Sequence, residues 1–305
     1  MLALIAGACV LSLPWTLGTG SDGSARYASG SLDAFLLPPS WAGHGGEESE
    51  RAANTSLSSV EGALGTDKLG RSVLVRVLCG GAVSLGVGIA SAAVSVFIGV
   101  LWGAIAASVG GRTDAVMMRI VDVLYGLPYI LLVVLLAVAG EAVIDRVGGG
   151  AAMGGWRTPF ELLVLLTAIG GVSWLTMSRV IRGQVLSLRS RPFMDAARAA
   201  GVGPVGQFTR HLLPNLVGPI VVYATLTVPQ AILQESFLSF LGIGVKPPLP
   251  SWGNLAAEGL GELNPVRVRW WLLVFPCGML AVTLVCLNVL GEAVREVFDP
   301  RSRRR

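Results

Sequence analysis

The sequence is poor in charge. Only 14% of its 305 residues are Asp, Glu, Lys or Arg, whereas 53% are hydrophobic and the mean hydropathy is +0.68. Soluble domains carry about 25% charged residues. The composition therefore excludes an ordinary soluble domain, and the chain is predicted to be an integral membrane protein.

Lysine, histidine and cysteine are also scarce. The positions of the few that are present bear on a phosphate-binding loop, a metal site and disulfide bonds. The only lysines, Lys68 and Lys246, do not follow a G-x-x-x-x-G pattern, so the chain holds no phosphate-binding P-loop. The only histidines, His44 and His211, fall on opposite predicted sides of the membrane and cannot share a metal. The four cysteines lie in or beside apolar runs, which indicates buried thiols; they are Cys9, Cys79, Cys277 and Cys286.

No apolar segment contains stacked carboxylates or a pair of residues at catalytic spacing. We therefore predict no enzyme activity, no cofactor and no metal site. If ATP drives transport through this chain, the ATPase must be a separate protein.

Apolar runs of about 20 residues predict an all-α, polytopic membrane bundle with six transmembrane helices. A first run, Leu2–Leu17, is either an anchor helix or a cleaved signal peptide. No basic residue precedes it and no clean A-x-A site follows it, which favours an anchor whose cytoplasmic tail was lost through start-site choice. The five stronger runs cover residues 81–108, 115–140, 160–186, 215–237 and 270–291.

Basic residues orient these helices. The loops 109–119 and 187–214, the C-terminal tail and the nearby helix ends hold thirteen arginines, against five basic residues in the opposite short loops. Because short basic loops remain in the cytoplasm, both termini are predicted to be cytoplasmic. The predicted divisions are an anchor (1–18), an outer loop (19–80), a five-helix membrane core (81–292) that includes loop 189–214, and a basic tail (293–305).

Small residues and prolines mark positions of packing or bending in the predicted helices. The ladder of small residues at i+4 spacing permits close helix contact, either within the chain or with a partner; it comprises Ser91, Ser95, Gly99, Gly103 and Ala107. Prolines in spanning helices are either hinges or ordinary residues; they are Pro128, Pro219, Pro229 and Pro276.

Two acidic residues lie in or near the predicted spans. Asp122 follows Arg119 by three residues, and we predict that the two form an ion pair on one face of the helix. Glu235, near the outer end of its span, is the candidate for the substrate path; it could touch a polar solute or reach the headgroups.

Residues 192–214 predict a helical hairpin between two spans. Pro192 can begin a helix, and Gly201 suits the left-handed residue that ends one. A second short helix is predicted to begin at Pro204 and to end at Pro214. Isolated helices shorter than about 12 residues are marginal, so a docking element for a cytoplasmic partner is predicted. Its backbone is left open by small residues, namely Ala196, Ala197, Ala199 and Ala200.

The hairpin resembles the EAA loop of ABC-importer membrane subunits, which reads E-A-A, three residues, Gly, nine residues and I-x-L-P. This chain has Asp195-Ala196-Ala197, Gly201 and His211-Leu212-Leu213-Pro214. It departs from the pattern at two positions. Asp195 replaces the usual Glu, and its shorter side chain would reach less far toward a basic ATPase residue. His211 replaces the usual Ile. The resemblance implies an ATPase-coupling loop formed by Arg191, Phe193, Asp195, Ala196, Ala197, Gly201, Phe208 and Pro214.

Four further segments are similar to the second, C-type permease of dipeptide, oligopeptide and nickel importers. They are LGTDKLGR (64–71), GQVLSLR (183–189), RHLLPN (210–215) and LSFLGIGVKPPLPSWGN (238–254). Just after the first, Ser72 replaces the usual Asp and Val75 the usual Ser.

The resemblance implies a type I ABC-importer permease in the bacterial inner membrane, in contact with lipid. The implied partners are a homologous second permease, two ABC ATPase subunits, an extracytoplasmic substrate-binding protein and a peptide substrate; no nucleic acid is implied. Nickel is the rival substrate, and the lack of histidine in every span favours peptide. A passive channel or a membrane scaffold is the alternative of a different class.

The two outer motifs also allow direct physical interpretation. Thr66 or Asp67 is predicted to cap the helix that leads into the 81–108 span, as an ordinary helix start or with a role in gating. The prolines of 247–250 stiffen an outer loop that either meets a substrate-delivering protein or braces two helices. Trp252 is predicted to lie at the membrane interface.

Overall fold

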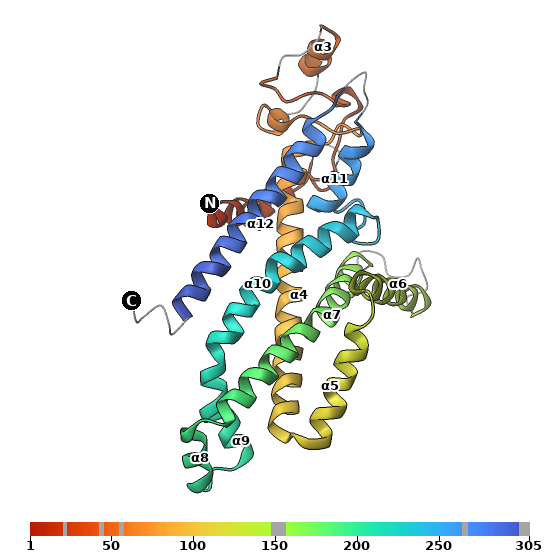
Figure 1. Cartoon of the computed structure of the whole chain (residues 1–305). Coiled ribbons are helices and arrows are strands. Elements are labelled where there is room, and N and C mark those ends of the chain that lie inside the picture. Colours follow the sequence, from red (N-terminus) through yellow and green to blue (C-terminus); the bar gives the residue numbers. More distant parts are fainter. Residues whose placement is uncertain (21–22, 43–45, 55–57, 148–156, 264–267, 299–305) are drawn as a thin grey trace. The chain divides into compact units, whose positions relative to one another are not determined.

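The computed structural model describes residues 1–305 except 21–22, 43–45, 55–57, 148–156, 264–267 and 299–305. Within these described ranges the chain is helical and contains no strand beyond isolated β-bridges, which confirms the all-α prediction. Figure 1 labels most of the helices. They are α1 (Leu2–Leu11), α2 (Leu13–Thr16), η1 (Leu32–Ala34), α3 (Gly46–Asn54), η2 (Glu61–Leu64), α4 (Val73–Val109), α5 (Gly111–Tyr125), α6 (Tyr129–Val147), α7 (Arg157–Arg189), α8 (Pro192–Ala199), α9 (Pro204–Gly206), η4 (Gln207–Leu212), α10 (Leu213–Phe240), α11 (Trp252–Gly261) and α12 (Trp271–Phe298).

Four helices in the described part are long and apolar enough to cross a membrane: α4, α7, α12 and the helix that runs from Pro204 to the end of α10. The pair α5 and α6 provides a fifth span if it is counted as one broken helix, because it bends by 92°. The first apolar run forms a shorter helix, Leu2–Thr16, so the sixth span stays a prediction.

The bend between α5 and α6 lies at Pro128, within the run 115–140 that was predicted as one span. Proline lacks an N–H and restricts the residue before it, so a helix tends to end there. The other three candidate hinges, Pro219, Pro229 and Pro276, lie inside the continuous helices α10 and α12.

The chain forms two compact units. The first comprises Met1–Val87 and Ile232–Cys286, and the second comprises Gly88–Ala231 and Leu287–Arg305. Helices α4, α10 and α12 each contribute residues to both units.

In the second unit, the ladder of small residues on α4 packs against α7 of the same chain. A Cβ atom on Gly99 would lie 2.5 Å from Cβ of Met177, and one on Gly103 would collide with the carbonyl oxygen of Ser178. The Ser91 hydroxyl donates a hydrogen bond to the Leu166 carbonyl at 3.3 Å. The close contact expected from the ladder is therefore made within the chain.

Alanine at Gly103 is expected to lower the free energy of unfolding by about 1–3 kcal/mol, because α4 and α7 would have to separate to admit one methyl group. Gly86, also on α4, is the matched control because a Cβ there meets nothing within 4 Å. Thermal unfolding of the purified variants in detergent measures the difference. Equal unfolding midpoints for Gly103→Ala and Gly86→Ala would contradict this packing.

In the first unit, Trp252 is completely buried, and its indole N–H donates to the Val77 carbonyl at 3.1 Å. The predicted interfacial position of Trp252 is therefore wrong. The indole fits because Gly81 lacks a side chain: a Cβ there would lie 2.6 Å from the Trp252 ring.

The helix start predicted at Thr66 or Asp67 is also displaced. Helix α4 begins at Val73, and its capping side chain is that of Ser72, whose hydroxyl accepts a hydrogen bond from the Val75 amide at 3.3 Å. Asp67 instead accepts from the amides of Leu69 and Arg71, at 2.8 and 2.9 Å, and so closes the turn before the helix.

Candidate coupling site

The first half of the hairpin (residues 189–214) has the predicted geometry. Arg191 is extended, Pro192 occupies the first turn of α8, and the helix ends at Ala199. Gly201 has a φ of +73°, so its predicted left-handed conformation is confirmed. The amide of Gly201 closes this end with a 3.0 Å hydrogen bond to the Arg198 carbonyl.

The second half of the hairpin differs from the prediction, because Pro214 does not end a helix. Helix α9 begins at Pro204 as expected, continues through the π-helical turn η4 and enters α10 without a break. A proline inside a regular helix clashes with the carbonyl four residues before it. The wider π turn immediately before Pro214 changes the register of the backbone hydrogen bonds, which makes room for its ring.

The inner face of the hairpin is apolar. Met194 on α8 is completely buried, Ala197 is nearly so, and Phe208 packs against the same cluster. The cluster joins α8 and η4 to α4, α7 and α10, and its buried members are Ala104, Ala107, Met177, Ile181, Val185, Met194, Leu212 and Leu216. Short helices are marginal alone, and this packing supports both.

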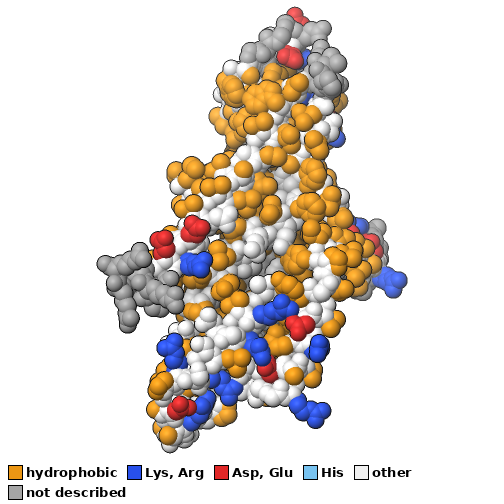
Figure 2. Space-filling model, in the orientation of Figure 1, with side chains coloured by type: hydrophobic (Ala, Val, Ile, Leu, Met, Phe, Trp, Pro, Cys, Tyr) orange, Lys and Arg blue, Asp and Glu red, His pale blue; other side chains and the backbone are white. Residues whose placement is uncertain are grey.

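The outer face of the hairpin remains open. Phe193 is 39% exposed and Val205 is 77% exposed, and Arg191, Ala196 and Pro214 are exposed as well. Figure 2 shows Lys and Arg side chains gathered around the end of the second unit that carries α8 and α9. This face therefore combines apolar and basic groups.

Asp195, the acidic residue of the motif, lies on the same open face. Its carboxylate accepts a hydrogen bond from Arg198 Nη1 at 2.9 Å. Both side chains of this pair are exposed, so it contributes at most about 1 kcal/mol. Asp195 can therefore exchange this partner for an external one at little cost.

Arginines of α7 connect the hairpin to neighbouring helices. Arg189 donates to the carbonyls of Ala107 and Ser108 at the C-terminal end of α4, where a cation is favoured by the helix dipole. Arg182 makes a bidentate ion pair with Asp114 of α5, with both distances 2.6 Å. The C-terminal part of α7 is thus joined to α4 and to α5 by charge-assisted hydrogen bonds.

The predicted pairing of Asp122 with Arg119 is wrong. Asp122 accepts from Arg179 Nη2 at 2.8 Å, and the same guanidinium lies 4.1 Å from the centre of the Tyr125 ring. Helix α7 lies beside α5, so Arg179, 57 positions from Asp122 in the sequence, pairs with the Asp122 carboxylate in place of Arg119.

Glu235, the candidate for the substrate path, is completely buried inside the first unit. Its carboxylate accepts hydrogen bonds from the hydroxyls of Ser239 at 2.7 Å and Ser236 at 3.2 Å, and it also bonds with Ser84 and Ser251. These four hydroxyls come from α4, α10 and the residue before α11. Four serine hydroxyls therefore enclose the Glu235 carboxylate within this chain, and its place in a substrate path stays a prediction.

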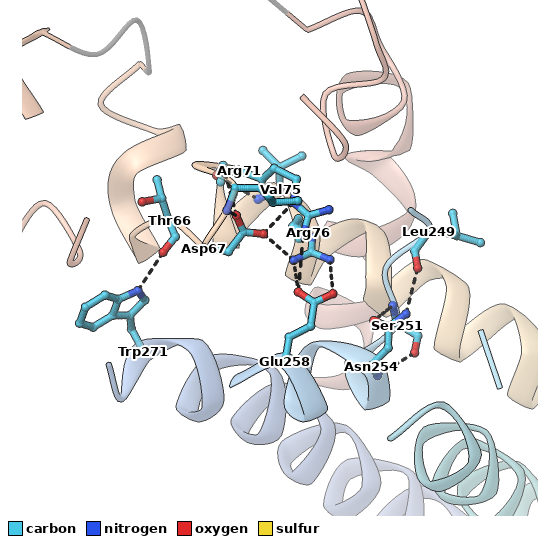
Figure 3. A network of polar contacts seen from close by, with 12 residues as sticks. Thr66, Asp67, Arg71, Val75, Arg76, Leu249, Ser251, Asn254, Glu258 and Trp271 are labelled. Carbon is cyan, nitrogen blue, oxygen red and sulfur yellow. Dashed lines mark hydrogen bonds and ion pairs between the residues drawn. The ribbon is translucent and has the colours of Figure 1, made fainter. Parts of the chain in front are cut away.

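Sequence reasoning missed a second polar cluster of the first unit, which we call the ion-pair network: Asp67, Arg71, Arg76 and Glu258 (Figure 3). Arg76 is 2% exposed; its Nη1 lies 2.6 Å from both Asp67 Oδ2 and Glu258 Oε2. Arg71 Nε donates to the same Asp67 oxygen at 2.7 Å. The network joins the turn before α4, α4 itself and α11.

Residues 99–304 match the family of binding-protein-dependent transport system inner membrane components. The chain belongs to this family. It is a transport permease, and its apolar helices make it a multi-pass inner-membrane protein.

Individual relatives agree with the family. The chain is 41% identical over 271 residues to the oligopeptide transport system permease protein OppC of Escherichia coli. This alignment covers 88% of this chain and 82% of the relative. It is 41% identical over 240 residues to the dipeptide transport system permease protein DppC of Bacillus subtilis, covering 79% and 69%. The OppC of Salmonella typhimurium is 44% identical over 240 residues, covering 78% and 72%. The resemblance inferred from the motifs is thereby confirmed.

Proposed function

We propose that this chain is one of two membrane subunits of an ATP-driven importer of dipeptides or oligopeptides. The observation that carries the proposal is the identity of 41% over 88% of the chain to a permease named for oligopeptide transport. Dipeptide permeases are similar to the same degree. Nickel has weaker support, because the spanning helices contain a single histidine, His211, which lies in the turn η4 at the hairpin end of the helix Pro204–Phe240.

The hairpin supports a separate ATPase as partner. The chain has no P-loop of its own, while the open face of the hairpin offers Phe193 and Val205 beside the exposed Asp195–Arg198 pair. An apolar anchor surrounded by charged groups is typical of a protein interface. We assign one ATPase to this hairpin, a second to the homologous permease, and substrate delivery to an extracytoplasmic binding protein.

Coupling follows from the connections of α7. Helix α7 leads directly into α8 (Figure 1), Arg189 binds the end of α4, and Arg182 binds α5. A displacement of the hairpin by the closing ATPases would therefore move the ends of three helices together. Such rigid-body motion would alternate the solute path between inward-open and outward-open states.

Affinity capture of the chain from solubilised membranes tests this proposal. We expect a second permease of the same family and two P-loop ATPases in the captured complex. Substituting aspartate for Phe193 and Val205 should release the ATPases but retain the second permease, because both side chains lie on the open face. A chain captured without any ATPase would favour a passive channel or scaffold.

The proposed topology places the hairpin and both termini in the cytoplasm. A reporter that is active only in the cytoplasm is expected to work after Arg112, Arg198 or Arg305, because the basic short loops lie there. It should fail after Gly150 or Pro250. Cytoplasmic activity of the fusion after Pro250 would contradict the six-span topology.

A further inference from the structure

A polar cleft of the second unit has no part in the hairpin or in the packing of α4 on α7. It lies between α5 and α7 and has a volume of about 510 Å³. The residues that line it are Ala115, Met118, Arg119, Asp122, Arg179 and Arg182. We call it the basic cleft, because three guanidinium groups face it and only one carboxylate does.

The arginines of the basic cleft keep hydrogen-bond donors for a ligand. Asp114 accepts from Nε and Nη2 of Arg182, which leaves Nη1 available. Arg179 uses one Nη2 donor for Asp122, and its side chain is 40% exposed. Arg119 is exposed and makes no ion pair with another residue that the structure describes. A guanidinium carries five donors in a planar fork that fits phosphate oxygens.

The sequence of α7 gives the depth of the basic cleft. Between Glu161 and Arg179 lie 17 residues without charge, which span about 26 Å at the rise of a helix. The hydrocarbon core of a bilayer is about 30 Å thick. In the proposed topology the C-terminal end of α7 is cytoplasmic, so Arg179 and Arg182 lie at the headgroups of the inner leaflet.

Apolar side chains adjoin the charged ones. On α5, Val116 is 61% exposed and Ile120 is also exposed, and these residues flank Arg119 in the sequence. On α7, Leu186 is exposed one turn beyond Arg182. A ligand that combines an anionic head with hydrocarbon chains therefore satisfies more of this surface than a soluble anion does.

We propose that the basic cleft binds the phosphate headgroup of an anionic phospholipid from the inner leaflet. Clefts of basic residues between spanning helices at the cytoplasmic face suit such headgroups. The proposal rests on the topology given with the proposed function. Free phosphate shares the chemistry of the headgroup, but the depth of the basic cleft and its apolar surroundings favour the lipid.

Photo-crosslinking tests the site in the complete importer. The complex is reconstituted in bilayers that contain a photoreactive phosphatidylglycerol or a photoreactive phosphatidylcholine with the same chains, and labelled peptides are mapped. We expect phosphatidylglycerol to label the segments around 115–122 and 179–182. The double variant Arg119→Gln/Arg179→Gln should reduce this labelling about tenfold, since each arginine near the surface contributes to lipid attraction.

Arg112→Gln is the matched control, because Arg112 is an exposed arginine of α5 that does not line the basic cleft. It should leave the labelling unchanged. Equal labelling by phosphatidylcholine, or equal labelling of the double variant, would overturn the proposal. Loss of labelling on addition of inorganic phosphate would identify a soluble-anion site instead, and loss with a free peptide but not with its C-terminal amide would identify a substrate site.

Peptide uptake by the same bilayers, sealed as vesicles, separates this inference from the proposed function. Uptake without cleft labelling contradicts only the lipid site. Labelling without uptake contradicts the peptide importer and leaves the lipid site standing.

Discussion

Valine at Gly201 is expected to reduce peptide uptake about tenfold or more while the protein remains inserted and paired with its partner permease. Gly201 has a φ of +73°, and a Cβ there would meet no atom within 4 Å. The cost is therefore backbone strain alone, about 1–2 kcal/mol for an ordinary residue in the left-handed region. A β-branched residue should join or misdirect the two short helices and so displace the ATPase-binding face.

Gly203→Val is the matched control for this substitution. A Cβ at Gly203 also meets nothing within 4 Å, but its φ of −63° suits any residue. Asp195→Ala should reduce uptake only partly, because an exposed charge contact contributes at most about 1 kcal/mol.

Uptake of labelled peptide and capture of the ATPase, at equal permease levels, measure these effects. Normal uptake by Gly201→Val would show that the hairpin does not couple ATP hydrolysis to transport. An equal loss in Gly203→Val would show that the conformation of Gly201 is not the cause.

Methionine at Arg76 is expected to lower the free energy of unfolding by about 3–5 kcal/mol. The guanidinium binds both Asp67 and Glu258, and its removal leaves these two carboxylates with Arg71 as the one remaining cation of the network. Thermal unfolding and protease cleavage of the outer segment measure the loss. The double variant Arg76→Met/Glu258→Gln should recover part of it, because one uncompensated charge is then removed.

Arg269→Met is the matched control for the ion-pair network. Arg269 makes an ion pair with Glu262 at 2.6 Å in the same unit, but both side chains are about one quarter exposed. Its loss should lower the free energy of unfolding by about 1 kcal/mol or less. Equal losses for Arg76→Met and Arg269→Met would show that burial of the ion-pair network contributes little to stability.

The sequence predicted the features that depend on a few neighbouring residues. Composition and apolar runs identified the membrane bundle, because a spanning helix must satisfy its own backbone. Proline at the first turn and glycine after the last turn located α8, because both act through their own backbone dihedral angles. The small residues of α4 predicted a close contact, although only the structure shows that α7 makes it.

The errors came from interactions between distant segments. Arg76 and Glu258 are separated by 182 positions and Asp122 and Arg179 by 57, so no local pattern pairs them. Trp252 was placed at the interface by residue type, whereas the space beside Gly81 buries it. Glu235 had a partial local signal, because Ser239 follows it by one helical turn. Its other partners, Ser84 and Ser251, come from separate elements.

ATP-dependent uptake in a defined system tests the central claim most directly. The chain, a second permease, two ATPases and the binding protein are reconstituted in vesicles, and a labelled oligopeptide is supplied on the side of the binding protein. We predict uptake that requires ATP and stops when either the ATPases or this chain is omitted. Peptide entering at the same rate without ATP, or with this chain left out, would contradict the assignment of the chain as a coupled permease subunit.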